Sequence, residues 1–335
     1  MNYKIFFNLI FLLLSFVTYS QAPKSEHLIS IHDFENFNDS IYTLIDLRKP
    51  KEYKKGHIPN AINLWRAHIV DSTLTIGGMK ISRDSLQVLF SKNGIKSTDK
   101  IIIYDAKGDV DAARLWWILF NYGHKNCALL NGGLIEWENQ NKPISTNIFI
   151  KQPSKYTFPN KQDQSLMISF NDMKKVVKDS SVIILDTRSF DEYIGKTLKN
   201  GAYRKGRIPR SQFIDWSDGV SYNGDMKFKS INDLKTIYNF NNAPLNQPIV
   251  TYCQSGVRSA HTTFILTQLL GFTNVRNYDG SWIEWSYHSE LDIETGQPKI
   301  VENESKQTKD FSPWGFVLSG VVLLILVIFI LYRKK

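Results

Sequence analysis

Cys253 has the sequence surroundings of a reactive thiol. It lies in the stretch Thr251–Ala260 (TYCQSGVRSA), between the apolar run Pro248–Val250 and a helix-patterned run over Ser259–Leu270. A thiol between the end of a buried strand and the start of a helix can be held as a thiolate, because loop N–H groups and the helix dipole both favour negative charge there. A thiolate is a strong nucleophile, so the pattern favours covalent catalysis. An inert, packed cysteine is the alternative that the loop alone leaves open.

The cysteine loop has a counterpart earlier in the chain that lacks the thiol. Asp105 and Gly108 stand 148 positions before Cys253 and Gly256, in the same pattern of apolar strand and loop. Segment 128–137 parallels 276–285 with the same offset, and segment 44–48 upstream parallels 184–188. A repeat of this length indicates two copies of one domain. Only the second copy keeps the sulfur.

Strands and helices are expected to alternate in both copies. The first copy reads as strand 41–46, helix 82–93, strand 101–104, helix 112–122 and strand 128–130. The second copy reads as strand 182–186, helix 231–240, strand 249–252, helix 259–270 and strand 274–277. Short apolar strands alternating with helices predict an α/β fold, in which each domain is a mostly parallel sheet covered by helices. Ligands of such sheets bind beyond the carboxyl ends of the strands, where Cys253 is expected.

The second copy also carries a cationic insertion. Two residues separate Tyr53 from Gly56, whereas twelve separate Tyr193 from Gly206. The insertion contains four cations, Lys196, Lys199, Arg204 and Lys205. It is either a wall for an anionic substrate or a solvated surface loop, and the sequence leaves both readings open.

Both ends of the chain resemble targeting or membrane segments. Residues 1–20, with one cation and an apolar stretch, are expected to be a signal peptide, with an uncleaved anchor as the alternative. Residues 314–332 form an unbroken apolar segment followed by the cytoplasmic tail 333–335, which predicts a transmembrane helix rather than a buried core helix. Residues 292–313 are polar and read as a flexible tether. We therefore expect a single-pass protein of the cell membrane with both domains on the extracytoplasmic (periplasmic) side.

Charge and cysteine content limit the kinds of ligand that the chain is expected to bind. The formal charge is +9, and removing Lys4 and the three terminal cations lowers it to +5. This excess suits small anions, whereas no basic stripe with interleaved aromatic residues predicts nucleic-acid binding. The two cysteines of the chain lack ligand-spaced histidines, so no metal site is expected. Cys127 aligns with Val275 and is expected to be a packed side chain, although a disulfide with Cys253 is conceivable in an exported protein.

Three motifs resemble the tandem-domain rhodanese family of sulfurtransferases, over nearly the whole exported part of the chain. Tyr53–Ala61 (YKKGHIPNA) is similar to an early family motif, and Val275–Trp285 (VRNYDGSWIEW) is similar to one near the family's C-terminal end. Cys253–Arg258 (CQSGVR) resembles the six-residue active-site loop. The sequence departs from the family where Asn60 follows Ile-Pro in place of glycine and where Arg207 replaces histidine.

The resemblance implies an inactive N-terminal domain packed on an active C-terminal one. The boundaries are then 21–145 for domain 1, with Asp105 at the cysteine position, 146–165 for a linker and 166–291 for domain 2. Cys253 would attack the outer sulfur of a donor and form a persulfide, which a cyanide or thiol acceptor would discharge. No cofactor is implied.

The resemblance also assigns roles around the persulfide. The loop residues Gln254, Ser255, Gly256 and Val257 would cradle its outer sulfur through their N–H groups. Arg258 and Arg188 would bind the donor's anionic end. For Arg188, a structural pair with Asp186 or Glu192 is the alternative.

The donor is open between two family types. Ser255 fits enzymes that use 3-mercaptopyruvate, whereas the cation Arg258 favours the thiosulfate dianion. A phosphatase is the rival enzyme class, but its signature has one more residue between cysteine and arginine than the four found here. A non-catalytic, membrane-anchored sulfur-binding or redox-sensing module is the other alternative.

Overall fold

The computed structural model describes residues 25–37 and 42–298 and contains two five-stranded parallel sheets. The elements of domain 1 are β1 Leu28–Ile29, α1 Ile31–Glu35, β2 Tyr42–Asp46, α2 Pro50–Lys55, β3 Ile62–Asn63, the 3₁₀ turn η1 Arg66–Ile69, α3 Arg83–Lys92, β4 Lys100–Tyr104, α4 Val110–Asn121, β5 Cys127–Leu130 and α5 Gly133–Asn139.

The second domain repeats this order. Its elements are β6 Met167–Ile168, α6 Phe170–Val176, β7 Ile183–Asp186, α7 Phe190–Tyr193, β8 Gln212–Phe213, the 3₁₀ turn η2 Trp216–Gly219, α8 Ile231–Ile237, β9 Ile249–Tyr252, α9 Val257–Phe264, the π turn η3 Ile265–Leu269, β10 Val275–Tyr278 and α10 Ser281–Tyr287. The α/β fold and the duplication predicted from the sequence are confirmed.

The two sheets have the same topology. Their strand orders are β1-β5-β4-β2-β3 and β6-β10-β9-β7-β8, so β4 and β9 are the central strands. The last pairs of the central register are Asp46 with Tyr104 and Asp186 with Tyr252. Asp105 and Cys253 come next in the chain, so each lies just beyond the carboxyl end of a central strand, where open parallel sheets bind ligands.

Local sequence explains most of these elements. The run Ile101–Ile103 is fully buried and β-branched, which suits the centre of a parallel sheet. Helix α3 begins after Ser82, whose side chain accepts the Ser85 N–H, and it ends before Gly94, which has positive φ. The helix expected over 259–270 starts two residues earlier and widens into a π turn, where Leu270 N–H bonds the Ile265 carbonyl at 3.0 Å.

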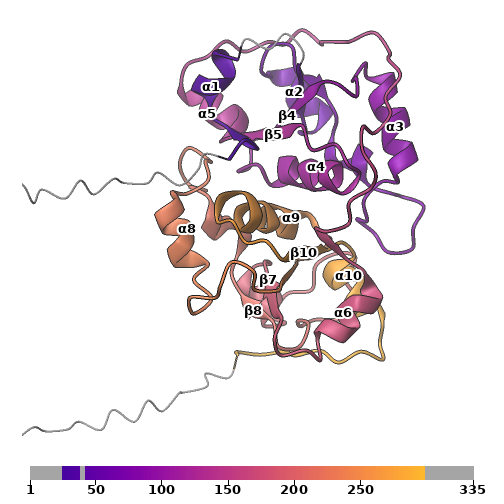
Figure 1. Ribbon diagram of the computed structural model, residues 1–335, viewed down its shortest axis with the longest axis vertical. Helices are drawn as coiled ribbons and strands as arrows, with labels where there is room; N and C mark the ends of the chain where they lie inside the picture. The colour runs from indigo at the N-terminus through magenta and orange to yellow at the C-terminus, as the bar shows by residue number, and fades with distance from the viewer. Residues whose placement is uncertain (1–24, 38–41, 299–335) are drawn as a thin grey trace, which may run out of the picture. The chain divides into compact units, whose positions relative to one another are not determined.

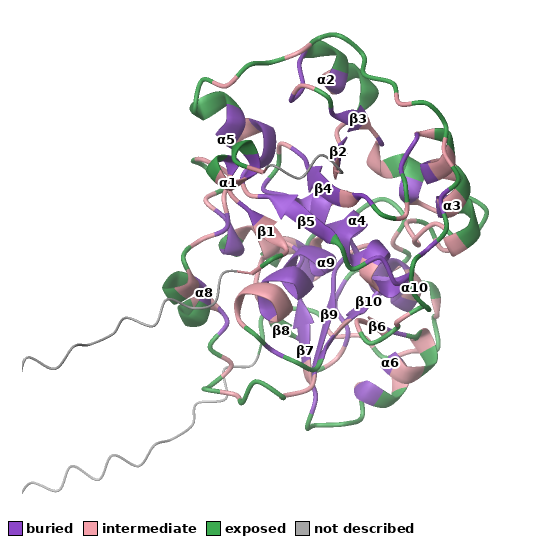
Figure 2. Cartoon of the chain, turned by 45° about the horizontal axis from the view of Figure 1, so that its top comes forward, coloured by how far each residue is buried: buried purple, intermediate pink, exposed green. Residues whose placement is uncertain are grey.

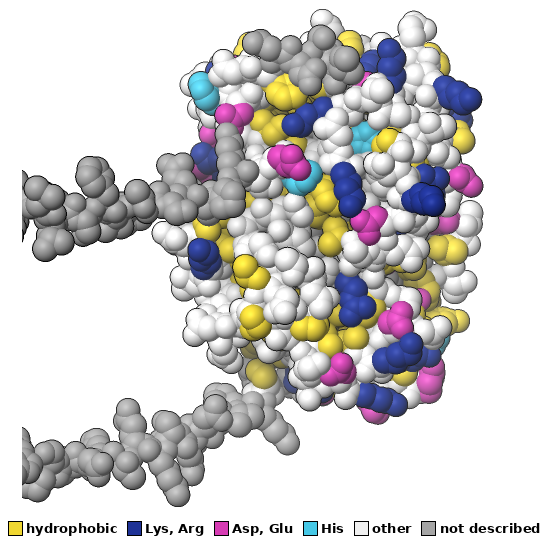
Figure 3. Space-filling view, viewed as in Figure 1, with side chains coloured by type: hydrophobic (Ala, Val, Ile, Leu, Met, Phe, Trp, Pro, Cys, Tyr) yellow, Lys and Arg dark blue, Asp and Glu magenta, His cyan; other side chains and the backbone are white. Residues whose placement is uncertain are grey.

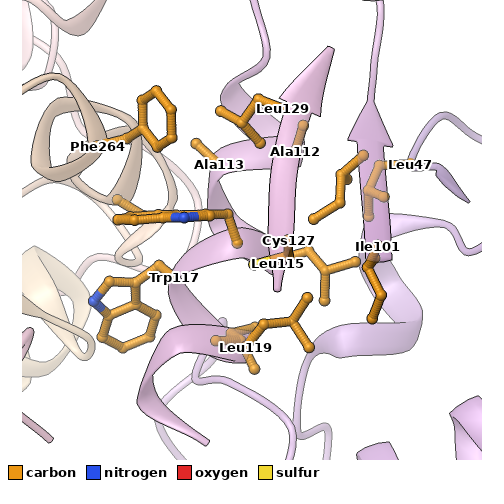
Figure 4. Packing of buried hydrophobic residues seen from close by; sticks show 14 of the residues in the cluster. Leu47, Ile101, Ala112, Ala113, Leu115, Trp117, Leu119, Cys127, Leu129 and Phe264 are labelled. Carbon is orange, nitrogen blue, oxygen red and sulfur yellow. The ribbon is translucent and has the colours of Figure 1, made fainter. Parts of the chain in front are cut away.

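One hydrophobic core joins the two domains. Helices α4 and α9 lie side by side between the sheets (Figure 1), and both are mostly buried (Figure 2). Trp116 of α4 meets Phe264 of α9 edge to face, with ring centroids 4.9 Å apart. Figure 4 shows Phe264 facing the side chains of α4. A fully buried aromatic pair across the boundary indicates that the domains pack as one body.

The segments that border the domains pack more closely than expected. Within the linker 146–165, Tyr156 is buried and its hydroxyl lies 2.9 Å from His124 Nδ1. At the other boundary, Glu294 and Arg207 exchange backbone hydrogen bonds, and the Gly296 N–H bonds the Ile194 carbonyl. Residues 292–296, predicted to belong to the tether, therefore pack on domain 2. The compact unit ends at Gly296.

The predicted terminal segments lie outside the described residues. This applies to the signal peptide 1–20, the transmembrane helix 314–332, the tail 333–335 and all of the tether beyond 298. Within residues 25–37 and 42–298, no helix has the length and apolar character needed to cross a bilayer. On the face shown in Figure 3, cationic and anionic side chains are interspersed.

Candidate active site

Cys253 lies beyond the end of β9 with 1% of its surface exposed. Its loop turns at Gly256, which has φ +73° and caps the start of α9. The Ser281 hydroxyl accepts hydrogen bonds from the N–H groups of Cys253 at 3.2 Å and Gly256 at 3.0 Å. The same hydroxyl donates to the Tyr278 carbonyl at 2.6 Å, and Trp282 N–H bonds the Cys253 carbonyl at 3.0 Å. The loop is therefore fixed by the start of α10 as well as by α9.

The surroundings of Cys253 favour its thiolate. Burial raises the pKa of the thiol, but the Arg258 charge and hydrogen bonding by Ser259 and by the Ser255 backbone outweigh burial, so the net pKa is lowered. The Ser259 hydroxyl is buried without a hydrogen-bond partner of good geometry among the described residues, so it is available to donate to a thiolate. The predicted nucleophile thus lies in an environment that activates sulfur.

The loop of domain 1 shows what such a loop binds. One oxygen of the Asp105 carboxylate accepts the N–H groups of Lys107 at 2.6 Å and Asp109 at 3.0 Å. The other accepts those of Asp111 at 2.8 Å and Ala112 at 3.2 Å. Four backbone donors therefore converge on one carboxyl group, which is the pattern of an anion-binding nest, although burial outweighs them and raises the pKa of Asp105.

The repeat transfers this cradle to domain 2. The four donor positions correspond to Ser255, Val257, Ser259 and Ala260. The backbones of Ser255 and Ser259 hydrogen-bond Cys253, whereas the Ala260 N–H bonds the Gly256 carbonyl at 3.3 Å. A carboxylate fills the cradle of domain 1, whereas in domain 2 the equivalent side chain is a thiol. The cradle of domain 2 can therefore stabilise negative charge on a sulfur attached to Cys253.

Arg258 is held by a buried carboxylate. Its two terminal nitrogens donate to the two oxygens of Glu192 at 2.8 and 2.9 Å. Lys199 Nζ lies 3.2 Å from the same carboxylate. Although burial opposes it, hydrogen bonding and the charges of Arg258 and Lys199 lower the pKa of Glu192 to about 2. Glu192 is thus ionised at neutral pH, and the cluster of two cations and one anion keeps a single positive charge.

Arg188 is buried, with 1% of its surface exposed. Its side chain pairs with Asp186, with Nε to Oδ1 at 2.9 Å and Nη2 to Oδ2 at 2.6 Å, and Nη2 also donates to the Gly206 carbonyl at 2.8 Å. Domain 1 contains the same pair, in which Arg48 Nη2 bonds Asp46 Oδ2 at 2.6 Å. The inactive domain keeps this arrangement, which is the structural pairing that the sequence offered as the alternative for Arg188.

The insertion brings one cation to the loop. Gln254, whose side chain donates to the Asn200 carbonyl at 3.2 Å, joins the loop to the insertion. Lys196 pairs with Asp191 at the surface, and Arg204 donates to carbonyls after α10. Lys205 is exposed. Most of the insertion therefore forms surface structure. Of its four cations, Lys199, which pairs with Glu192 beside the Cys253 loop, best fits the predicted wall for an anionic substrate.

Sequence reasoning missed a group of residues that supports the loop from domain 1. Arg114 of α4 donates to the Gly256 carbonyl at 3.2 Å and to Asp279 Oδ1 at 2.5 Å. The Lys80 N–H bonds the other oxygen of Asp279 at 3.2 Å, and Asn277 Nδ2 donates to the Gly256 carbonyl at 3.0 Å. Asp279 stands in a motif that the sequence singled out, but nothing in the sequence pairs it with Arg114.

The second cysteine has no comparable setting. Cys127 and Cys253 are both free and buried. Cys127 lies on β5 among apolar side chains such as Leu115 and Ile101 (Figure 4), and burial raises the pKa of its thiol well above the ordinary value. It is a packed side chain, as predicted. Among the described residues, no cluster of three or more His, Cys, Asp or Glu side chains is arranged to hold a metal ion.

Comparisons with known proteins agree with this geometry. The model of the rhodanese-like domain matches residues 32–140 and 169–288. Sulfur carrier protein TtuD of Thermus thermophilus is 32% identical over 243 residues, covering 70% of this chain and 83% of its own. The putative thiosulfate sulfurtransferase SseA of Mycobacterium bovis is 34% identical over 257 residues, 74% of this chain and 84% of its own. The thiosulfate sulfurtransferase of Corynebacterium glutamicum is 32% identical over 254 residues, 73% and 82% of the two chains.

Solved structures share the fold. The crystal structure of YnjE superposes with a TM-score of 0.71 at 24% identity, covering 82% of this chain and 69% of that one. A persulfide-bearing variant of EanB with ergothioneine superposes with a TM-score of 0.68 at 21% identity, covering 78% of this chain and 66% of that one. At these identities the likeness concerns the fold alone.

Two rhodanese-like domains with a cysteine loop define a class of sulfur-handling protein. The chain belongs to the rhodanese-like family and is a rhodanese-type sulfurtransferase.

Proposed function

We propose that the protein moves the outer sulfur of thiosulfate to cyanide or a thiol through a persulfide on Cys253. The Cys253 thiolate attacks the outer sulfur, the sulfur–sulfur bond of thiosulfate breaks, and sulfite leaves with the bonding electron pair. The acceptor then attacks the outer sulfur of the persulfide, and the Cys253 thiolate is released unchanged. Each half is a nucleophilic displacement, so ping-pong kinetics are expected.

The observation that carries this proposal is the anion cradle. In domain 1 four N–H groups bond the Asp105 carboxyl group, and two of the corresponding positions, Ser255 and Ser259, hydrogen-bond Cys253 through their backbones. A persulfide bears its negative charge on the outer sulfur, one atom beyond Cys253 Sγ. Converging backbone donors stabilise such a charge without reorganisation during the reaction. The lowered pKa of Cys253 supplies the nucleophile.

The charges beside the loop support a dianionic donor. Arg258 is paired with Glu192, which offsets the single cation that favoured thiosulfate in the sequence. Lys199, half exposed and 3.2 Å from the same carboxylate, restores an excess positive charge. Relatives named as thiosulfate sulfurtransferases point the same way. 3-Mercaptopyruvate, which carries one carboxylate, is the alternative donor.

A direct assay tests the proposal. Purified residues 21–312 should form thiocyanate from thiosulfate and cyanide, and Cys253→Ser should not. Cys127→Ser is the matched control, because Cys127 is buried outside the loop, and it should keep the activity. Equal activity of wild type and Cys253→Ser would remove Cys253 from the mechanism. Faster turnover with 3-mercaptopyruvate than with thiosulfate would reassign the donor.

We also propose that the enzyme acts outside the cytoplasm, anchored by its C-terminal segment. The proposal is supported by the apolar stretches in residues 1–20 and 314–332 and by the terminal cations Arg333, Lys334 and Lys335. It adds a location and no chemistry to the catalytic proposal.

A further inference from the structure

Arg114 is a buried cation of domain 1 whose side chain contacts both domains. It stands on α4 with 1% of its surface exposed. Its guanidinium donates to the Gly256 carbonyl, to Asp279 Oδ1 and, at 3.1 Å, to the Gly78 carbonyl. It also stacks on Trp117, with Cζ 4.9 Å from the ring centroid. A planar guanidinium bound at several points holds its partners in a defined orientation.

The contact with Gly256 helps to fix the direction of one peptide in the loop. The carbonyl of Gly256 accepts from Arg114, from Asn277 and, at 3.3 Å, from the Ala260 N–H in the first turn of α9. The described residues contain no cis peptide bonds, and in a trans peptide the C=O and the following N–H point in opposite directions. The Val257 N–H is therefore turned away from the domain boundary. The equivalent N–H in domain 1, that of Asp109, donates to Asp105 Oδ1 at 3.0 Å.

In the inactive domain the corresponding carbonyl faces a neutral ring in place of a charged guanidinium. The Gly108 carbonyl is the counterpart of the Gly256 carbonyl, and it lies near the ring of His261 on α9. Burial lowers the pKa of His261 to about 3 despite the opposing Gly108 carbonyl, so this ring is neutral. Neither ring nitrogen has a hydrogen-bond partner of good geometry among the described residues. Of these two loop carbonyls, the one in the cysteine loop is therefore the one bonded by a charged side chain, Arg114, that makes several hydrogen bonds.

We propose that Arg114 is a positioning residue for sulfur transfer, through which domain 1 fixes the Gly256–Val257 peptide of the Cys253 loop. This inference rests on the proposed function. Asp279 holds Arg114 in place. Its carboxylate pairs with the guanidinium and also accepts the Lys80 N–H of domain 1 at 3.2 Å. The thiol-free domain thus contributes to catalysis without touching the substrate.

The test compares the reactivity of Cys253 in three variants. Arg114→Met removes the contact and a charge, and Arg114→Met with Asp279→Asn removes both charges. Arg114→Lys keeps the charge but has all its donors on one nitrogen, so it loses the planar contact that Nη1 and Nη2 make together. The pH dependence of Cys253 alkylation by iodoacetamide is followed by peptide mass spectrometry, which separates Cys253 from Cys127. All three variants should show a higher apparent pKa of Cys253. Their kcat/KM for thiocyanate formation should fall roughly 10- to 100-fold, mainly in kcat.

The charge-neutral double variant is the decisive one, because a raised pKa in it reflects lost positioning rather than lost charge. Arg83→Met is the matched control: Arg83 is a domain 1 cation that donates to the Asn160 carbonyl at 3.1 Å and stacks on Phe158, outside the loop. It should keep the wild-type profile. A folded double variant, judged by circular dichroism, with wild-type pKa and rates would overturn the proposal. If the other two variants do not fold, wild-type pKa and rates in Arg114→Lys would overturn the proposal.

The two proposals fail in different ways. A wild-type protein that transfers sulfur from no donor would refute the proposed function, but its alkylation profile would still show whether Arg114 acts on Cys253. An active wild type whose Arg114 variants behave like Arg83→Met would refute the positioning role alone.

Discussion

At the scale of single residues, the site is a thiol whose charge state is set by its neighbours. Arg258 is the largest of the influences that lower the pKa of Cys253, and it opposes the effect of burial. A lowered pKa means that the thiolate persists below the ordinary cysteine pKa of about 8.5 and is lost only as the pH falls through the lower value. The acid limb of kcat/KM against pH therefore reports this thiol.

Replacing Arg258 should move that acid limb. In Arg258→Met the pKa of Cys253 should rise, so the limb shifts to higher pH and activity at pH 7 falls roughly 3- to 10-fold, as a shift of up to one pKa unit implies. Arg258→Lys, which keeps the charge but not the two-point contact with Glu192, should fall in between. The measurement is kcat/KM for thiocyanate formation between pH 5 and 9. An unshifted limb in Arg258→Met would show that Arg258 does not set the pKa.

Glu192 should contribute stability with a defined pH dependence. Its pKa of about 2 in the folded protein lies below the ordinary value near 4.3, so its contribution is full above that value and is lost as the pH falls toward 2. Glu192→Gln should lower the free energy of unfolding at pH 7 by about 2 to 3 kcal/mol, because Arg258 loses a buried partner. Urea unfolding at pH 7 and pH 3 measures this difference, which should shrink at the lower pH.

The neighbouring residue offers a control for Glu192. Asp191 forms a surface pair with Lys196, and such pairs contribute about 0 to 1 kcal/mol. Asp191→Asn should therefore change stability little at either pH. Equal losses in Glu192→Gln and Asp191→Asn would contradict the buried role of Glu192.

At the scale of elements, the turn from β9 into α9 determines where the sulfur and its donors lie. Gly256 adopts φ +73°, and a Cβ there would fall 2.8 Å from Arg114 Nη1 and 2.8 Å from the Asp279 carbonyl oxygen. Gly256→Ala should thus displace the loop and lower kcat/KM by roughly 100-fold. Steady-state kinetics, with circular dichroism to verify folding, tests this expectation.

Gly271 is a close match for the backbone conformation of Gly256. It has φ +79°, but a Cβ at this position would meet no heavy atom within 4 Å among the described residues. Gly271→Ala should cost only the backbone strain, about 1 kcal/mol, and should leave kcat/KM within about threefold of wild type. Similar kinetic losses in both variants would attribute the effect to strain rather than to the packing around the loop.

Sequence patterns predicted the elements well because their causes are local. The apolar strands, the Ser82 cap and the glycine beyond helix α3 are all visible in consecutive residues. The π turn after Phe264 has no comparable signal, since it continues the helical pattern. Arg188 illustrates the opposite limit: the sequence left substrate binding and a pair with Asp186 or Glu192 both open, and only the fold shows that Arg188 bonds Asp186 and the Gly206 carbonyl.

At the scale of the whole molecule, the repeat identified the two domains but not the contacts between them. Aligning the copies predicted that Asp105 replaces the thiol. It did not predict that Arg114 and Asp279, 165 residues apart, pair beneath the loop. Contacts of that range depend on how α4 packs on α9, and no local pattern records it.

The location of the protein is a further prediction at this scale. The full-length chain should sediment with membranes, whereas a chain truncated after residue 312 should be released in soluble form from the same compartment. Cell fractionation with protease protection measures both properties. Recovery of the full-length chain in the soluble fraction would contradict the anchor, and protection from external protease in spheroplasts would contradict the extracytoplasmic orientation.

The central claim is that Cys253 carries the transferred sulfur. Intact-protein and peptide mass spectrometry after incubation with thiosulfate, without acceptor, tests it most directly. The peptide containing Cys253 should gain one sulfur atom, and cyanide should remove it with release of thiocyanate. No gain should occur on Cys127 or in Cys253→Ser. Turnover to thiocyanate by an enzyme whose Cys253 never gains sulfur would contradict the claim.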